Sequence, residues 1–223
     1  MKLVYPEINH VFDTESGKIN CIVIENQRLF YSLLEDIYNQ LNGYEGRAVL
    51  SENNKILKTD KSMEVLSQFI PFDINKKSLI NKISSELERK AVSDDFYSQT
   101  VELLSQLENH LMNISFDFSC DINYNKLDIG AIIKASGVEI NDTYNSLGEK
   151  IIDYMELVTE FDRRKLYLTV NLRSYISDNE ASEFMKTVLS HGYNVIMLES
   201  SEHTHLDEEL RYIIDADLCE INY

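Results

Sequence analysis

A strand, a capped helix and a second strand follow one another in the last third of the chain, and this order limits the fold most strongly. Residues 166–171 (LYLTVN) are an apolar run of strand length. Ser177 and Glu180 have the spacing of a capping box, and the helix they begin runs to residue 190, before Gly192. Residues 193–198 (YNVIML) form a second apolar run. A crossover helix of this kind joins parallel strands with a right-handed connection, so the sequence predicts an α/β fold with a parallel sheet.

The N-terminal part of the chain contributes to the same fold. Residues 18–25 (KINCIVIE) predict a buried strand, and residues 28–41 predict an amphipathic helix with Asn26 as its N-cap. Short strands are expected near residues 47–50 and 218–222. Strands at both ends of the chain therefore predict one α/β body formed by two separate segments.

The middle of the chain has a helical pattern. The expected helices are 62–69, 78–90, 94–112, 128–135 and 144–161. We therefore expect the α/β body to comprise residues 1–58 and 161–223, and a mostly helical domain, residues 59–160, to be inserted into it.

Twelve residues within this helical region, ISFDFSCDINYN, alternate between apolar and polar side chains. Period two predicts a half-buried strand. The run Asp121-x-Asn123-x-Asn125 also resembles the start of a calcium loop. In an EF-hand counted from Asp121, position six is Gly and position twelve is Glu, but this chain has Lys126 and Ile132 there. The spacing therefore excludes an EF-hand.

The polar face of this predicted strand still carries oxygen atoms that calcium prefers. Side chains two residues apart on a strand point the same way, about 6.6 Å apart. Calcium takes oxygen ligands at about 2.3–2.6 Å, so Asp121 and Asn123 can lie on either side of one ion, and Asp117 joins them only if the strand bends. The spacing alone favours the simpler alternative, a solvated polar face.

Motifs for nucleotide hydrolysis and other common catalysis are absent from the sequence. Gly17-Lys18 is the only glycine-lysine pair that suggests a phosphate loop, but a Walker A loop would replace Phe12 by Gly and Ile19 by Ser or Thr. The patterns G-x-G-x-x-G, G-x-S-x-G and H-E-x-x-H do not occur either. We therefore expect no catalytic residues.

Two further groups of polar residues have a simple explanation. His203 and His205 lack a third zinc ligand at a defined spacing, which is more typical of a loop. Asn171 and Arg173 follow a predicted parallel strand, where α/β proteins bind ligands, but no nucleophile or base accompanies them.

The charge and composition limit the partners. The formal net charge of −17 argues against nucleic acid, because phosphate binding needs local Lys and Arg. Eight carboxylates lie between Glu199 and Glu220, however, so other faces can be less acidic. The three cysteines have no pairing motif, and no apolar run reaches membrane-spanning length. We expect a soluble, cytoplasmic protein.

Several segments in this order resemble the CRISPR-associated Csn proteins of type II-A systems. KLDIGAIIKASGVEI (126–140) and LGEKIIDYMEL (147–157) resemble two of the family's helices, and SMEVLSQFIPFDINKKSLINKISSEL (62–87) resembles its first helical pair. LTVNLRSYISDNE (168–180), VIMLES (195–200) and YIIDADLCEI (212–221) resemble its strands and capped helix. Together these segments span most of residues 62–221.

The resemblance implies a specific fold and function. Family members combine a degenerate body, similar to a P-loop NTPase but without a working phosphate loop, with an inserted helical leg. They form homotetrameric rings that bind double-stranded DNA ends without reading sequence or catalysing a reaction, and they work with other CRISPR acquisition and effector proteins. The resemblance also implies bound calcium (Ca²⁺) ions.

The family residues carry over to this chain only in part. Lys134 and Lys150 occupy positions of lysines on the family's DNA-facing surface, while Glu139 replaces another such lysine. In the calcium region Asp117 and Asp121 keep the family's acids. Asn123, Asn125 and Lys126 replace other acids, which lowers the expected affinity for calcium.

Two other functions stay open at this point. A degenerate metal-dependent nucleotidase or nuclease would use the acids of residues 117–128 to activate water. An acidic scaffold would bind only protein partners.

Overall fold

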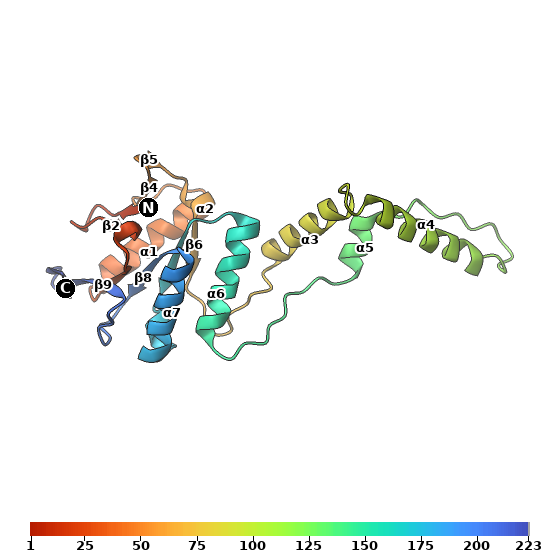
Figure 1. The fold of residues 1–223 in the computed structure, drawn as a ribbon. Coiled ribbons are helices and arrows are strands. Elements are labelled where there is room, and N and C mark those ends of the chain that lie inside the picture. The colour runs from red at the N-terminus through yellow and green to blue at the C-terminus, as the bar shows by residue number, and fades with distance from the viewer. Residues whose placement is uncertain (223) are drawn as a thin grey trace. The chain divides into compact units, whose positions relative to one another are not determined.

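A computed structural model describes residues 1–222, and the chain divides into two compact units. Met1–Asp73 and Thr143–Tyr223 form one unit, which we call the body, and Ile74–Asp142 form the second, which we call the helical unit. Figure 1 labels the elements of both. The units part after residues 73 and 142, whereas the sequence expectation placed the boundaries after residues 58 and 160.

A six-stranded sheet forms the centre of the body, in the order β10-β9-β3-β8-β7-β6. All neighbouring strands are parallel except β10 and β9. The strands are β3 (Ile19–Ile24), β6 (Met63–Leu66), β7 (Leu166–Val170), β8 (Asn194–Glu199), β9 (Glu209–Ile214) and β10 (Glu220–Asn222). The predicted parallel crossover is confirmed: α7 (Asp178–His191) connects β7 to β8.

Helix α7 begins and ends where the sequence predicts. The Oγ of Ser177 accepts a hydrogen bond from the backbone N–H of Glu180, whose carboxylate accepts one from the N–H of Ser177 at 2.8 Å. Gly192 ends the helix with φ of 69°, a left-handed conformation that glycine adopts without strain. Both ends of the crossover are therefore fixed by local hydrogen bonding and backbone geometry.

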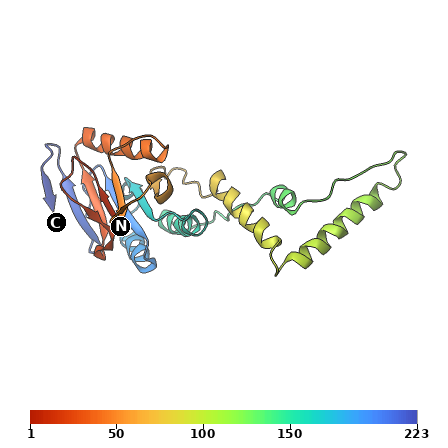
Figure 2. The same cartoon turned by 90° about the horizontal axis from the view of Figure 1, so that it is seen from above.

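The two faces of the sheet are covered differently. Figure 2 shows α1 (Gln27–Leu41) on one side and α6 (Leu147–Leu157) and α7 on the other. The core on the α1 side includes Leu33 and Ile37 of α1 and Ile22 and Ile196 of the sheet. A small antiparallel sheet packs into this core: β2 (Phe12–Asp13), β1 (Lys2–Val4), β4 (Val49–Glu52) and β5 (Lys55–Ile56).

The helical unit contains three helices, α3 (Lys77–Ala91), α4 (Tyr97–Ile114) and α5 (Ile129–Ala135). Helices α3 and α5 pack together, and the carboxylate of Glu88 lies against Gly130. A Cβ at Gly130 would lie 2.9 Å from the Glu88 carboxyl carbon. Helix α4 buries none of its residues. This unit therefore has much less core than the body.

The remaining elements are short. They are α2 (Thr59–Ser62), two 3-10 turns at Thr14–Ser16 and Leu172–Ser174, and a π-helical turn at Val158–Asp162. Among the described residues, no helix combines the length and the apolar character needed to cross a membrane.

Two sequence predictions of secondary structure are wrong. Residues 114–125 do not form a strand: α4 continues to Ile114, and turns and irregular backbone follow it. A strand needs a neighbouring strand for its backbone hydrogen bonds, and the described part of the helical unit contains none. Residues 62–69 are not a helix, because residues 63–66 pair with β7 as the edge strand β6.

Candidate nucleic-acid interface

The two lysines expected to contact DNA lie in different units. Lys134 is an exposed residue in the last turn of α5. Lys150 is half-buried in the first half of α6. Their role in DNA binding stays a prediction, and each lysine must be considered with its own surroundings.

A group of cations that the sequence reasoning missed lies where β6 and β7 begin. These strands are parallel and Met63 pairs with Leu166, so the segments that precede them lie side by side. The backbone N–H of Lys165 donates to Ser62 O at 2.9 Å and joins the two segments directly. We call the cations of these segments the basic edge: Lys58, Lys61, Arg163, Arg164 and Lys165.

The five cations of the basic edge have different surroundings. The guanidinium of Arg164 pairs with Asp162 at 3.1 Å and donates to the carbonyls of residues 60 and 63, so it supports the backbone. Lys165 pairs with Glu52 at 2.6 Å. Lys58, Lys61 and Arg163 are exposed and make no ion pair with any residue in 1–222. Three cations of the edge are therefore available to an external anion.

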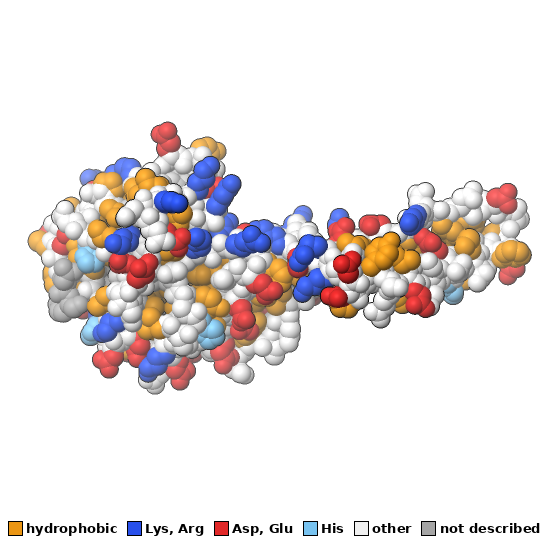
Figure 3. All heavy atoms as spheres, turned by 45° about the horizontal axis from the view of Figure 1, so that its top comes forward, with side chains coloured by type: hydrophobic (Ala, Val, Ile, Leu, Met, Phe, Trp, Pro, Cys, Tyr) orange, Lys and Arg blue, Asp and Glu red, His pale blue; other side chains and the backbone are white. Residues whose placement is uncertain are grey.

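The surface of the body has an uneven charge distribution. In Figure 3, Lys and Arg side chains gather toward the upper part of the body, and Asp and Glu predominate toward its lower part. A net charge of −17 therefore coexists with a local basic surface. The sequence contained a signal for this surface, since two groups of cations each precede an apolar run. Lys58 and Lys61 precede residues 63–66, and Arg163–Lys165 precede residues 166–170. The signal was lost because residues 62–69 were predicted to be a helix.

The predicted calcium ligands lie in the irregular segment after α4. Asp117, Asp121, Asn123 and Asn125 are all exposed. The two asparagines line a cavity of about 390 Å³, together with Glu108, Met112, Ile122, Tyr124 and Lys126. One carboxylate and one ammonium in this lining make a weak donor set for calcium.

A wider search of side chains does not strengthen this site. Within residues 1–222, no three His, Cys, Asp or Glu side chains come together in a way that could hold a metal ion. The residues as placed do not form a calcium site by themselves, and calcium binding stays a prediction.

The connection between β3 and α1 consists of Glu25 and Asn26 alone. The side chain of Asn26 accepts a hydrogen bond from the N–H of Leu29 at 3.0 Å and donates to the carbonyl of Ala216 at 2.8 Å. The N-terminus of α1 is therefore capped by the side chain of Asn26. This geometry agrees with the absence of a Walker A motif.

Arg173, which follows β7, is buried in an ion network instead of facing a ligand. Its guanidinium donates to Asp178 at 2.7 Å, to the carbonyl of Thr204 at 3.1 Å and to Glu209 at 3.5 Å. Its backbone N–H donates to Glu199 at 3.2 Å. Glu199 and Glu209 are fully buried, with 0% and 1% of their surface exposed.

The predicted histidine pair belongs to the same network. Arg211 is buried, pairs with Glu209 and donates to the carbonyl of His203 at 2.6 Å. His205 Nδ1 lies 2.9 Å from Glu209, and His203 Nε2 lies 3.7 Å from Glu199. The histidines therefore contact carboxylates in two places and do not converge on one metal.

Burial dominates the electrostatics of this network. It raises the pKa of Glu199 to about 7 against hydrogen bonds from the backbone of residues 172 and 173. Burial also lowers the pKa of His203, with smaller contributions from Arg173 and Arg211. The two arginines pair with Asp178, Glu202 and Glu209 and also donate to the carbonyls of residues 203 and 204, which indicates a structural network that holds the loop of residues 200–208 against the body.

Comparisons with known proteins agree on one family. A family model described as CRISPR-associated protein (Cas_Csn2) matches residues 40–218. A CRISPR-associated protein Csn2 from Enterococcus faecalis is 20% identical over 204 residues, which cover 91% of each chain. A second CRISPR-associated protein Csn2, from Streptococcus agalactiae, is 22% identical over 224 residues, covering 97% of this chain and 96% of the relative.

These matches confirm the resemblance to the type II-A Csn proteins that the sequence motifs indicated. Neither relative is named as an enzyme. Because the family model matches well over half of the residues, this chain belongs to the Csn2 family of CRISPR-associated proteins.

Proposed function

We propose that this protein binds double-stranded DNA at its ends, independently of sequence and without catalysis, during CRISPR spacer acquisition. Family membership supports the role in acquisition. The observation that carries DNA binding is the basic edge, where Lys58, Lys61 and Arg163 are exposed without an ion pair in the described chain. Such cations attract phosphate oxygens and do not distinguish bases.

The proposal includes an assembly and its ligands. We expect a homotetrameric ring in the cytoplasm, acting with other CRISPR acquisition and effector proteins. Lys134 and Lys150 would add phosphate contacts, and Ca²⁺ would bind near Asp117 and Asp121. These parts follow from the family resemblance.

We also infer that the body is a degenerate relative of P-loop NTPases. The β3–α1 connection has the position of a phosphate loop but consists of Glu25 and Asn26, which supply a carboxylate and a helix cap. This connection lacks the glycine-rich backbone that surrounds a phosphate. We therefore expect neither ATP hydrolysis nor DNA cleavage, and metal-dependent turnover lost in Asp121→Ala would favour the nuclease or nucleotidase alternative.

The central experiment compares linear duplex with closed circular DNA of the same sequence, in a gel-shift titration at several salt concentrations with calcium present. Light scattering on the same samples gives the native mass. We expect a tetramer that binds linear duplex more tightly than circles. Equal binding to both forms, or no binding at low salt, would contradict the proposal.

The basic edge has its own test. Each phosphate contact contributes about 0.9 to the slope of log K against log salt, so the variant Lys58→Ala, Lys61→Ala, Arg163→Ala should lower the slope by about 2.7. The control, Lys18→Ala, Arg28→Ala, Lys90→Ala, removes the same charge from other exposed positions. If both variants lower the slope equally, net charge and not the basic edge determines binding.

The predicted lysines provide a separate comparison. The double variant Lys134→Ala, Lys150→Ala should lower the slope by about 1.8 if both contact phosphate, while the native mass stays that of the wild type. An unchanged slope would remove these two lysines from the interface without affecting the basic edge.

A further inference from the structure

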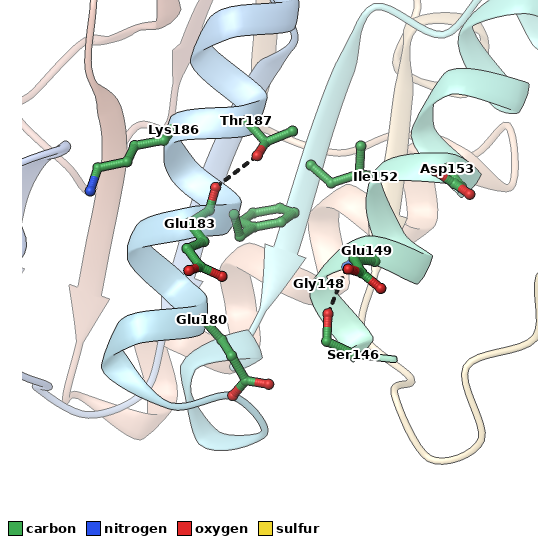
Figure 4. Close-up of a pocket in the computed structure, with 10 residues that line it drawn as sticks. Ser146, Gly148, Glu149, Ile152, Asp153, Glu180, Glu183, Lys186 and Thr187 are labelled. Carbon is green, nitrogen blue, oxygen red and sulfur yellow. Dashed lines mark hydrogen bonds between the residues drawn. The ribbon is translucent and has the colours of Figure 1, made fainter. Parts of the chain in front are cut away.

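A groove of about 510 Å³ lies between α6 and α7 in the body (Figure 4). Its floor consists of the buried lining residues Gly148, Ile152 and Phe184. A Cβ at Gly148 would lie 3.8 Å from the Cβ of Phe184, an ordinary van der Waals distance, so the two helices are close together here. The groove thus offers a small apolar surface at its base.

The rim of the groove is acidic. Glu149 and Asp153 come from α6, and Glu180 and Glu183 from α7. None of the four forms an ion pair within residues 1–222. Glu180 accepts hydrogen bonds from the backbone N–H and hydroxyl of Ser177, which hold its pKa below the usual value. The rim is therefore negatively charged at neutral pH.

The one cation in the lining does not neutralise this rim. Lys186 pairs with Glu208 at 3.3 Å, and Figure 4 shows its ammonium group turned away from the groove. Burial raises the pKa of Tyr193, and the negative charges of Glu156 and Asp153 raise this pKa further. Four carboxylates thus surround an apolar floor and form no ion pair with a cation among residues 1–222.

We propose that this groove binds a lysine- and arginine-rich segment of a partner protein, which inserts one apolar side chain between α6 and α7. Charge complementarity identifies the occupant, because the rim attracts ammonium and guanidinium groups and repels DNA phosphate. The floor adds a requirement for an apolar anchor, which a polyamine does not possess. The carboxylates on both helices set the spacing of the cations, and the floor fixes the register of the segment.

A fluorescein-labelled amphipathic peptide, with lysine and arginine on one face and leucine on the other, tests this proposal by fluorescence anisotropy. We expect salt-sensitive binding to the full chain. The variant Glu149→Gln, Glu183→Gln removes two cation contacts and should weaken binding about three- to tenfold. A peptide with serine in place of leucine should bind about tenfold more weakly, because the apolar contact is lost.

The matched control is Glu25→Gln, Glu45→Gln, which removes the same charge from exposed positions outside the groove. It should leave peptide binding unchanged. Equal weakening in both double variants, or equal binding of the leucine and serine peptides, would overturn the proposal. A changed native mass in the Glu149→Gln, Glu183→Gln variant would also overturn it, because the groove would then be an interface between copies of this chain. Linear duplex binding by both variants should match the wild type, which separates this test from that of the proposed function.

Discussion

Replacing Arg173 by Met should unfold the body at a much lower temperature, because it leaves a buried carboxylate without its counter-charge. The network contains Arg173 and Arg211 against Glu199 and Glu209, all buried. In the variant Arg211 still pairs with Glu209, and Glu199 keeps the backbone hydrogen bond but loses the nearby positive charge of Arg173, which lowers its pKa in the wild type. Breaking a buried pair in this way costs about 3–5 kcal/mol. For a protein of this size, that corresponds to a fall in Tm of about 6–20 °C.

Differential scanning calorimetry at pH 8 measures this change. In the wild type burial raises the pKa of Glu199 to about 7, so Glu199 is mostly ionised at pH 8. Loss of Arg173, whose charge lowers this pKa, raises it further in the variant, so the cost at pH 8 is that of keeping Glu199 charged or of protonating it. The cost should shrink toward pH 6, where Glu199 takes up a proton and loses its charge. The matched control is Arg163→Met, which removes the same charge from an exposed site and should change the unfolding free energy by less than about 0.5 kcal/mol.

The double variant Arg173→Met, Glu199→Gln tests the reasoning further. Removing the unbalanced carboxylate should restore much of the lost stability, so the two substitutions should not be additive. A loss within about 1 kcal/mol of that in Arg163→Met would refute the idea that the loop of residues 200–208 keeps water from the network. Additive losses in the double variant would show that Arg173 acts through packing instead of charge.

Three further predictions concern other sites. Glu199 has a folded-state pKa of about 7, above its ordinary value of 4.5, so the folded state binds a proton first and gains stability as pH falls from about 7 to about 4.5. The unfolding free energy of the wild type relative to Glu199→Gln should therefore rise over this range by up to about 3 kcal/mol, and a flat difference would contradict the assignment. Asp117→Ala with Asp121→Ala should abolish calcium binding measured by isothermal titration calorimetry, and the same heat in variant and wild type would place calcium elsewhere. Gly46→Ala should destabilise the body by about 1–3 kcal/mol in urea unfolding, because its Cβ would lie 2.4 Å from the carbonyl oxygen of Asp36, and an unchanged midpoint would show that this loop moves freely.

Local sequence patterns were sufficient for most elements of the body. Asn26, Ser177 and Glu180 mark helix starts through side-chain hydrogen bonds that form within a few residues, and the structure confirms all three. The long apolar runs of β3, β7 and β8 predicted buried parallel strands correctly. These signals are local, because the capping side chains and the apolar residues that indicate an element lie in that element or directly beside it.

The candidate interface depended on contacts between distant segments. The short apolar run at 63–66 fits a helix or a strand, and only its pairing with β7 makes it a strand. That pairing places Lys58 and Lys61 beside Arg163, so the basic edge could not be predicted from the local sequence pattern. Lys134 and Lys150 came from the family resemblance, and their role stays a prediction.

The sequence by itself determined the α/β class, the parallel crossover with its caps and the family, because each rests on local hydrogen bonding or on motifs within one segment. Tertiary structure decided the rest. The alternating residues 114–125 form no strand because no strand lies beside them, although their pattern has the right period. The sequence showed only that carboxylates are concentrated between Glu199 and Glu220, and in the structure the arginine at 173, far away in sequence, allows two of these glutamates to be buried. A charge can leave water only when a partner is present, and that partner is known only once the chain has folded.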